Sequence, residues 1–202
     1  MSETKTKYKL GLQLPTDPRW ANMAEISLEE ILTDHAFCEQ KATTSCISLI
    51  QKYPKHTRLV NELSPVVTEE WGHFRLVIAE MEKRGMQLGE QRNDEYVVAL
   101  RKFQKKDGSR ETALIDALLA FALIEARSCE RFRLLSLNIS DPKLRDFYHM
   151  FMVSEAGHYR MFLDLAYHYA NDDVFVKNRW QQYLDFEEEL MKTLKPRADR
   201  MH

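Results

Sequence analysis

Apolar residues recur along this chain in alternating steps of three and four positions, the period of a helix with one buried face. Four long runs show this period, at 26–51, 57–84, 110–138 and 141–169. No run alternates as a strand does between turn signals, and the six Gly and six Pro are sparse. The pattern predicts an all-α chain with four long helices.

Two of these runs have a particularly regular apolar stripe. On 57–84 the stripe consists of Leu59, Leu63, Val66, Glu70, His73, Val77 and Met81. On 141–169 it consists of Leu144, Tyr148, Phe151, Glu155, His158, Phe162 and Leu165. We expect these stripes to face the core of a helix bundle.

The beginning of the first long helix carries a recognisable signal. Ser27 and Glu30 have the spacing of a capping box, and Ile26 with Ile31 has that of a hydrophobic staple. The helix is therefore predicted to begin there, after an irregular segment at 1–25.

Proline marks two further positions. Pro65 lies inside the second run, which predicts a kink or a restart with Ser64 as the new cap. Asp141 followed by Pro142 predicts the N-cap and first residue of the fourth long helix.

The segment between the second and third long helices, 85–109, is far longer than a tight turn needs. It predicts the long crossover of a ferritin-like four-helix bundle, with a short helix of its own at about 94–104. A fifth helix is expected at 173–194, before a basic tail at 195–202. We expect a single domain over 1–202. The candidate packing residues of the fifth helix are Phe175, Trp180, Leu184 and Leu190.

Six residues on the apolar stripes carry candidate chemistry: Glu39, Glu70, His73, Glu125, Glu155 and His158. Two of the glutamates precede a histidine by three residues around the same glycine, and this spacing puts both side chains on one helix face. A carboxylate in a core must be neutralised, paired or bound to metal. Four carboxylates carry −4 and two divalent ions carry +4, so the charges cancel. The set predicts a dinuclear metal centre of the kind found in di-iron and di-manganese carboxylate bundles.

Several residues near the candidate ligands allow more than one interpretation. Glu130 rivals Glu125, but it points about 140° away around the helix. His35, one turn before the first ligand, could orient a ligand or face a substrate; we interpret it as a core histidine. The shared position of Gly72 and Gly157 indicates a tight helix approach or room beside the metals, and an ancient duplication would place them equally well. The oxygen-rich ligand set favours iron or manganese over zinc.

Composition narrows the class of protein. The three cysteines lack a Cys-x-x-Cys spacing, which argues against a disulfide framework, a zinc ribbon or a rubredoxin-type site and indicates reduced thiols. No stretch approaches eighteen uninterrupted apolar residues, and the first twenty residues are too polar for a signal peptide. We therefore expect a cytoplasmic protein with no membrane partner. The sequence indicates no oligomeric state.

The net charge of −2 does not by itself indicate a nucleic-acid partner. The crossover nevertheless holds five cations within ten residues: Arg101, Lys102, Lys105, Lys106 and Arg110. Such a cluster can hold phosphates of RNA, and the alternative is a solvated helix face.

Three stretches carry a resemblance to known proteins: Leu-x-Asp-His-Ala-x-x-Glu-x-Lys-Ala around Glu39, Glu-x-x-His-Phe from Glu70, and Leu-Ile-Glu-Ala-Arg-Ser-Cys-Glu-Arg-Phe at 123–132. On these residues the chain resembles the ferritin-like di-iron proteins. More narrowly, it resembles the tRNA hydroxylase family that acts on 2-methylthio-isopentenyl-adenosine next to the anticodon.

The resemblance implies that Glu70 and Glu155 bridge two iron ions, while Glu39 and Glu125 each complete one ion. It further implies an O2-dependent monooxygenase that hydroxylates the isopentenyl group, with the tRNA anticodon loop as substrate and an external electron donor. The alternatives are a rubrerythrin-like or ferritin-like di-iron peroxidase or ferroxidase, and a metal-dependent structural bundle without turnover.

Overall fold

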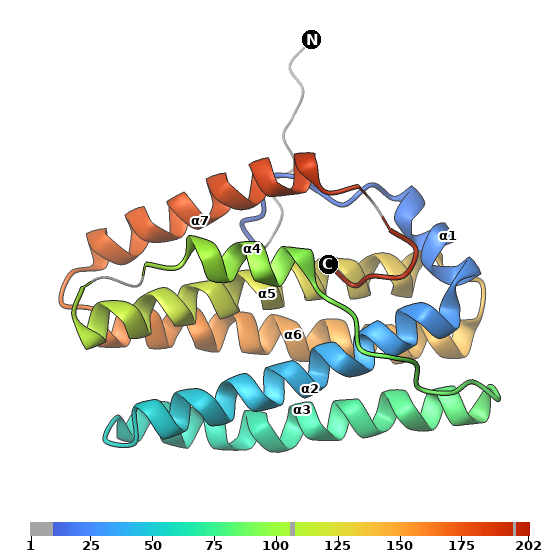
Figure 1. Ribbon diagram of the computed structural model, residues 1–202, viewed down its shortest axis with the longest axis horizontal. Helices are drawn as coiled ribbons and strands as arrows, with labels where there is room; N and C mark the ends of the chain where they lie inside the picture. Colours follow the sequence, from blue (N-terminus) through green and yellow to red (C-terminus); the bar gives the residue numbers. More distant parts are fainter. Residues whose placement is uncertain (1–9, 106–107, 196) are drawn as a thin grey trace, which may run out of the picture. The chain divides into compact units, whose positions relative to one another are not determined.

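The computed structural model describes residues 10–105, 108–195 and 197–202. This part of the chain contains seven helices and no strand (Figure 1). The helices are α1 (Arg19–Ile26), α2 (Leu28–Lys52), α3 (Thr57–Lys83), α4 (Glu95–Phe103), α5 (Arg110–Asn138), α6 (Pro142–Tyr169) and α7 (Asp173–Thr193). The prediction of an all-α chain with four long helices, which are α2, α3, α5 and α6, is confirmed.

The chain divides into two compact units. Unit 2 comprises Pro18–Asp94 and Arg197–Met201, and it contains α1, α2 and α3. Unit 1 comprises the described residues of 1–17 and 95–196 together with His202, and it contains α4 to α7.

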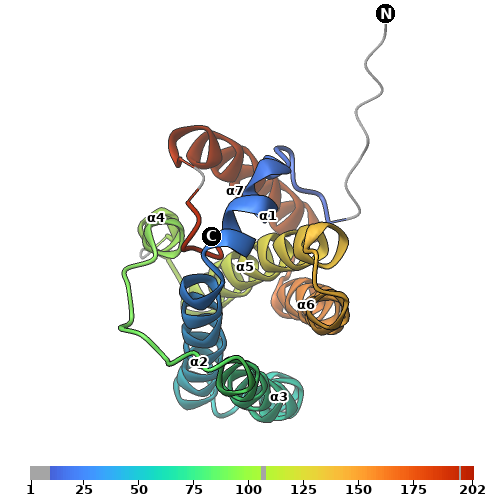
Figure 2. The ribbon, with the colours of Figure 1, turned by 90° about the vertical axis from the view of Figure 1, so that its right-hand side faces the viewer.

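In unit 2, α2 and α3 lie side by side and are joined by the short segment 53–56 (Figures 1 and 2). A connection this short makes neighbouring helices antiparallel. The buried residues of α3 are Leu59, Leu63, Val66, Glu70, His73, Val77 and Met81. This is the predicted stripe, residue for residue.

The prediction of an irregular segment at 1–25 is wrong where it overlaps α1, and its residues 1–9 lie outside the described part of the chain. Trp20, Ala21 and Ala24 are buried on one face of α1. The indole Nε1 of Trp20 also donates a hydrogen bond to the carbonyl oxygen of Arg197, at 3.0 Å. Packing therefore stabilises a helix that is too short for its apolar period to be recognised in the sequence.

The predicted capping box and staple at the start of α2 are also wrong. The Ser27 side chain makes no capping hydrogen bond to the described first turn, and Ile26 is 87% exposed. Ser27 also terminates α1, where its backbone N–H donates to the carbonyl oxygen of Met23 and is not left for Glu30. Its φ of −108° and ψ of 42° are not the extended conformation in which an N-cap hydroxyl reaches the first turn. The conformation of the chain at the end of α1 thus prevents Ser27 from capping α2.

Helix α3 continues through Pro65 without the predicted restart, and Ser64 is an exposed residue inside it. Proline removes one hydrogen bond to the carbonyl four residues earlier. That carbonyl belongs to Asn61, which is exposed, so water can satisfy it.

In unit 1, α5 and α6 lie side by side and are joined by 139–141 (Figures 1 and 2). Asp141 accepts a hydrogen bond from the backbone N–H of Lys143, and Pro142 opens α6, as predicted. The buried residues of α6 are Leu144, Tyr148, Phe151, Glu155, His158, Phe162, Leu165 and Ala166. They reproduce the predicted stripe with one addition.

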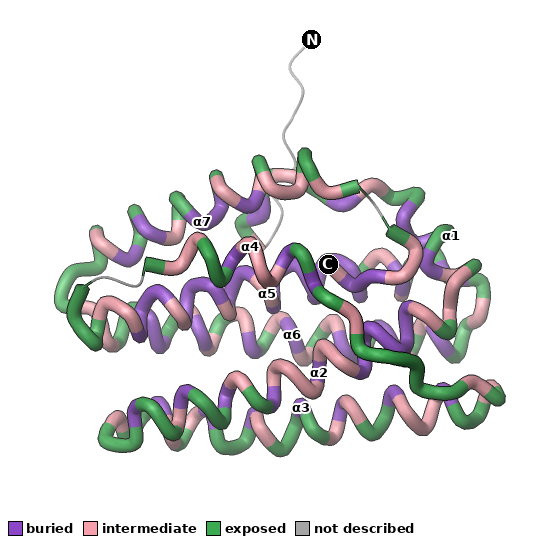
Figure 3. The backbone as a smooth tube through the Cα atoms, viewed as in Figure 1, coloured by how far each residue is buried: buried purple, intermediate pink, exposed green. Residues whose placement is uncertain are grey.

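Buried residues occur along nearly the whole of α5, because α6, α7 and α4 all pack against it (Figure 3). The crossover contains α4 where a short helix was predicted. In α7 only Leu184 of the four candidate packing residues is buried. The other buried residues of α7 are Val176, Arg179, Tyr183 and Glu187. The two charged ones can be buried because Asp116 and Arg127 on α5 pair with them.

Candidate metal centre

Unit 2 gathers three of the six predicted ligands into one cluster. Glu39 comes from α2, and Glu70 and His73 come from α3. The Nδ1 atom of His73 lies 3.4 Å from Oε2 of Glu39 and 3.4 Å from Oε2 of Glu70. All three side chains are buried. The three-residue spacing on α3 and the antiparallel neighbour α2 therefore bring one imidazole and two carboxylates together.

Two further side chains lie against this cluster, and one of them, His35, is hydrogen-bonded to it. His35 is fully buried, and its Nε2 lies 2.8 Å from Oε1 of Glu39. It is thus a core histidine, as interpreted, but it also holds the Glu39 carboxylate. On the other side, Oε1 of the exposed Glu69 lies 3.9 Å from Nε2 of His73. At this distance the pair is an electrostatic contact and not a hydrogen bond.

Unit 1 gathers the other three predicted ligands. Glu125 comes from α5, and Glu155 and His158 come from α6. The Nδ1 atom of His158 lies 3.5 Å from Oε2 of Glu155, and all three side chains are buried. The buried Oε1 of Glu155 has no hydrogen-bond partner among the described residues. A buried carboxylate oxygen without a hydrogen bond is costly, and coordination of a metal ion would remove that cost.

Each cluster fits one divalent ion in charge and in size. Two carboxylates carry −2, and one divalent ion cancels them. Within each cluster one ligand atom per residue lies within 4.8 Å of the others. Two atoms that each lie about 2.1 Å from one ion are at most about 4.2 Å apart, so small side-chain shifts suffice. The paired oxygen and nitrogen donors suit iron or manganese.

Glu130 is not part of the unit 1 cluster. Its Oε1 accepts a hydrogen bond from the backbone N–H of Thr16 at 2.8 Å, and its Oε2 accepts one from Nη1 of Arg127 at 2.7 Å. The carboxylate is thus engaged in a buried ion pair on another face of α5.

Sequence reasoning missed this buried network. Arg127 also donates to Oε1 of Glu187 on α7, from Nε at 2.8 Å and from Nη2 at 2.5 Å. The available signal was the Arg-x-x-Glu spacing from Arg127 to Glu130 inside a helix that is apolar around most of its circumference. Its partner on α7 lies 60 residues away and leaves no local signal.

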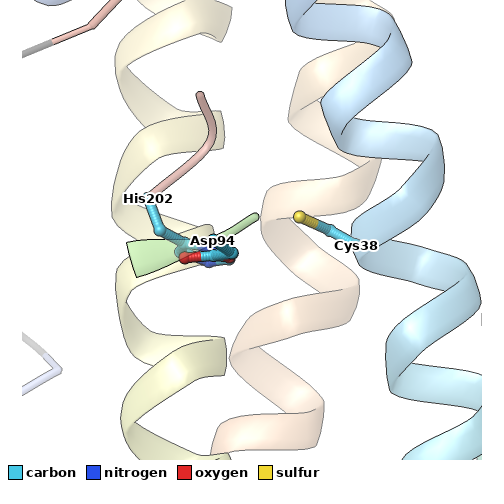
Figure 4. A group of neighbouring side chains, drawn as sticks. All are labelled: Cys38, Asp94 and His202. Carbon is cyan, nitrogen blue, oxygen red and sulfur yellow. The ribbon is translucent and has the colours of Figure 1, made fainter. Parts of the chain in front are cut away.

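A thiol and a carboxylate also lie close together in unit 2. The Sγ of Cys38 and a carboxylate oxygen of Asp94 are within 4.8 Å of each other (Figure 4). Burial raises the pKa of the Cys38 thiol well above its usual value, and the negative charges of Asp34 and Asp94 raise it further. Because only the thiolate binds a metal well, this pair is a poor ligand set.

The two glycines of the ligand motifs do not mark a tight helix approach. A Cβ atom placed on Gly72 or Gly157 would meet no described atom within 4 Å beyond its chain neighbours and its own helix backbone. The interpretation of a tight helix approach was wrong, because Gly72 is partly exposed and Gly157 is exposed, with no described neighbour close to either.

Comparison with known proteins decides the family. The model of the family described as tRNA-(MS[2]IO[6]A)-hydroxylase (MiaE) matches residues 3–202, nearly the whole chain. The chain belongs to this family. Its relatives include a tRNA 2-(methylsulfanyl)-N(6)-isopentenyladenosine(37) hydroxylase from Pseudomonas putida, 38% identical over 80% of this chain and 77% of that protein. An enzyme of the same name from Salmonella typhimurium is 26% identical over 84% of this chain and 80% of that protein.

A solved structure shares the fold. It is described as "Protein 43 with aldehyde deformylating oxygenase activity from Synechococcus". The match has a TM-score of 0.88 and 30% sequence identity, and it covers 95% of this chain and 94% of that one. The predicted ferritin-like all-α fold is thereby confirmed, and this member of the hydroxylase family is an enzyme.

The structure places the basic crossover residues at the end of α4 and the beginning of α5. Arg101 and Lys102 are exposed in the last turn of α4, Lys105 is exposed just after it, and Arg110 is the exposed first residue of α5. Lys106 lies outside the described residues. In the described part of the chain, no helix has the length and apolar character needed to cross a membrane.

Proposed function

We propose that this protein hydroxylates the isopentenyl group of 2-(methylsulfanyl)-N(6)-isopentenyladenosine at position 37 of tRNA. The match of the hydroxylase family model to residues 3–202 carries this proposal. Further support comes from the names of the relatives in Pseudomonas putida and Salmonella typhimurium. The proposed reaction consumes O2 and takes two electrons from an external donor. Its proposed location is the cytoplasm.

We propose that the six carboxylate and histidine ligands hold two iron ions as a di-iron centre. The support is the pair of buried clusters, each with two carboxylates and one imidazole. When bound, ferrous iron supplies the reducing equivalents and the open coordination positions that O2 activation needs. The protein neutralises the ions with four carboxylates, and His35 keeps the Glu39 carboxylate oriented toward the cluster. Burial of the ligands excludes water from the reacting atoms.

The proposed substrate is the anticodon loop, in which position 37 lies in a single strand. Bases in RNA loops can be splayed out of the stack and inserted into a protein site. We propose that the crossover cations hold phosphates of this loop: Arg101, Lys102, Lys105, Lys106 and Arg110. Exposure of the four described members supports this assignment, because phosphate contacts require cations at the surface.

Nucleoside analysis tests the proposed reaction. Purified protein loaded with ferrous iron is supplied with O2, a chemical reductant and tRNA that carries the prenylated, methylthiolated base. We expect mass spectrometry of the digested tRNA to show a gain of one oxygen atom on that nucleoside. The control is the same tRNA under nitrogen. If the nucleoside keeps its mass while the iron content is complete, the proposed function is refuted.

Iron analysis tests the ligand set. We expect the wild type to bind two irons per chain, and Glu70→Ala or His158→Ala to lose stoichiometric binding. The matched control is Glu62→Ala, a surface glutamate of α3 paired with Arg58. Two irons per chain in either ligand variant would show that the ligand set is wrong.

The alternative function is a di-iron peroxidase or ferroxidase that does not act on RNA, and the family match disfavours it. A peroxidase would consume hydrogen peroxide at the same rate with and without tRNA. We expect instead that O2 consumption depends on the prenylated tRNA.

A further inference from the structure

Ser128 occupies a special position on α5. It follows Glu125 by three residues, the same step that separates the glutamate from the histidine in α3 and in α6. Residues three apart share one face of a helix, so its hydroxyl lies on the same side of α5 as the Glu125 carboxylate. The residue is buried, at 8% exposure.

The hydroxyl of Ser128 is hydrogen-bonded to a distant residue of the same unit. Nε2 of His202 lies 2.9 Å from Oγ of Ser128. The His202 ring, labelled in Figure 4, stacks on the ring of Tyr96 with centroids 5.2 Å apart and planes 13° apart. The Tyr96 hydroxyl in turn donates to Oε1 of Glu187 at 3.3 Å. The imidazole is therefore fixed both on its face and at its Nε2 edge.

His202 is partly exposed, whereas Ser128 is buried. An imidazole can accept a proton on one nitrogen and release one from the other, near neutral pH. A serine hydroxyl can accept one proton and pass on its own. The pair thus connects solvent with the buried face of α5 that carries Glu125.

We propose that His202 and Ser128 form the proton relay of the hydroxylation, an inference that rests on the proposed function. The reaction consumes O2, two electrons from the external donor and two protons. One oxygen atom enters the C–H bond and the other leaves as water. The His202 imidazolium gives its Nε2 proton to Ser128 Oγ while the hydroxyl passes its own proton to the departing oxygen. The neutral imidazole then regains a proton from solvent, and a second passage through the same two groups supplies the second proton of the water.

Kinetics of four variants test the relay. General acid catalysis typically contributes a factor of 10² to 10⁴, and water can replace part of it, so His202→Ala and Ser128→Ala should lower kcat by at least about tenfold. The KM for tRNA should not change. Added imidazole should restore His202→Ala but not Ser128→Ala, and Ser128→Thr should stay active because it keeps the hydroxyl. The matched control is His149→Ala, an exposed histidine on α6, with wild-type kcat.

A second measurement does not depend on activity. In metal-free protein with ¹⁵N-labelled histidine, the Nε2 proton of His202 should exchange with water at least about tenfold faster in Ser128→Ala than in the wild type, because its hydrogen bond is lost. Equal exchange rates would overturn the proposed hydrogen bond. If the wild type is active and His202→Ala has an unchanged kcat, or a lowered kcat that added imidazole does not restore, the relay is overturned while the proposed function stands. A wild type that hydroxylates nothing refutes the proposed function instead.

Discussion

Removal of the Arg127 side chain should strongly destabilise the protein. It is fully buried on α5 and makes five hydrogen bonds within unit 1. Two go to Glu187, and the others go to Glu130, to the hydroxyl of Thr16 and to the carbonyl oxygen of Leu14. The substitution Arg127→Met keeps much of the side-chain volume and removes every one of these bonds.

The magnitude follows from the charge that is left behind. Glu187 is 0% exposed, so without Arg127 its carboxylate has to be protonated or stay charged in the core. Breaking a buried ion pair by removing one partner costs about 3–5 kcal/mol. Burial opposes the charge of Arg127, but Glu187 and Glu130 more than offset it, so the pKa of Arg127 lies above its usual value. The arginine therefore stays charged at every pH of interest.

Urea denaturation followed by circular dichroism measures the effect, with both proteins free of metal because bound metal would add to the apparent stability. The matched control is Arg58→Met, which removes an exposed pair with Glu62, where the side chains are 43% and 31% exposed. An exposed pair contributes about 0–1 kcal/mol. If Arg127→Met costs less than about 1 kcal/mol, or no more than the control, the network does not stabilise the fold as argued.

Three further outcomes are expected from the same structure. Asp141→Ala should cost about 1 kcal/mol because it loses a cap, whereas Ser27→Ala should be nearly neutral in the same urea assay. Gly72→Ala and Gly157→Ala should each raise the free energy of unfolding by up to about 1 kcal/mol, and destabilisation would show that the space around them is not open. The thiols should react slowly with a disulfide reagent at pH 8 in the folded protein and fast in urea. Burial and then the charge of Glu70 raise the pKa of Cys46 to about 12, which keeps it protonated; fast labelling of the native protein would contradict this.

The sequence by itself determined the helices and the ligand-bearing faces. The buried residues of α3 are the predicted stripe, and α5 spans Arg110–Asn138 as its period predicted. The reason is that helical periodicity is local, so a polar residue at a core position is visible without any partner. Glu39, Glu70, Glu125 and Glu155 were recognised in this way.

Junctions and partners were decided only by the tertiary structure. Ser27 has the spacing of a capping residue, but its backbone N–H is hydrogen-bonded to the last turn of α1. Helix α1 itself is stabilised by the burial of Trp20. The hydrogen-bond partners of Ser128 and Arg127 were likewise decided by the tertiary structure. His202 lies 74 residues from Ser128, and Glu187 lies 60 residues from Arg127. Contacts at such separations depend on where whole helices pack, and no periodicity within one segment records that.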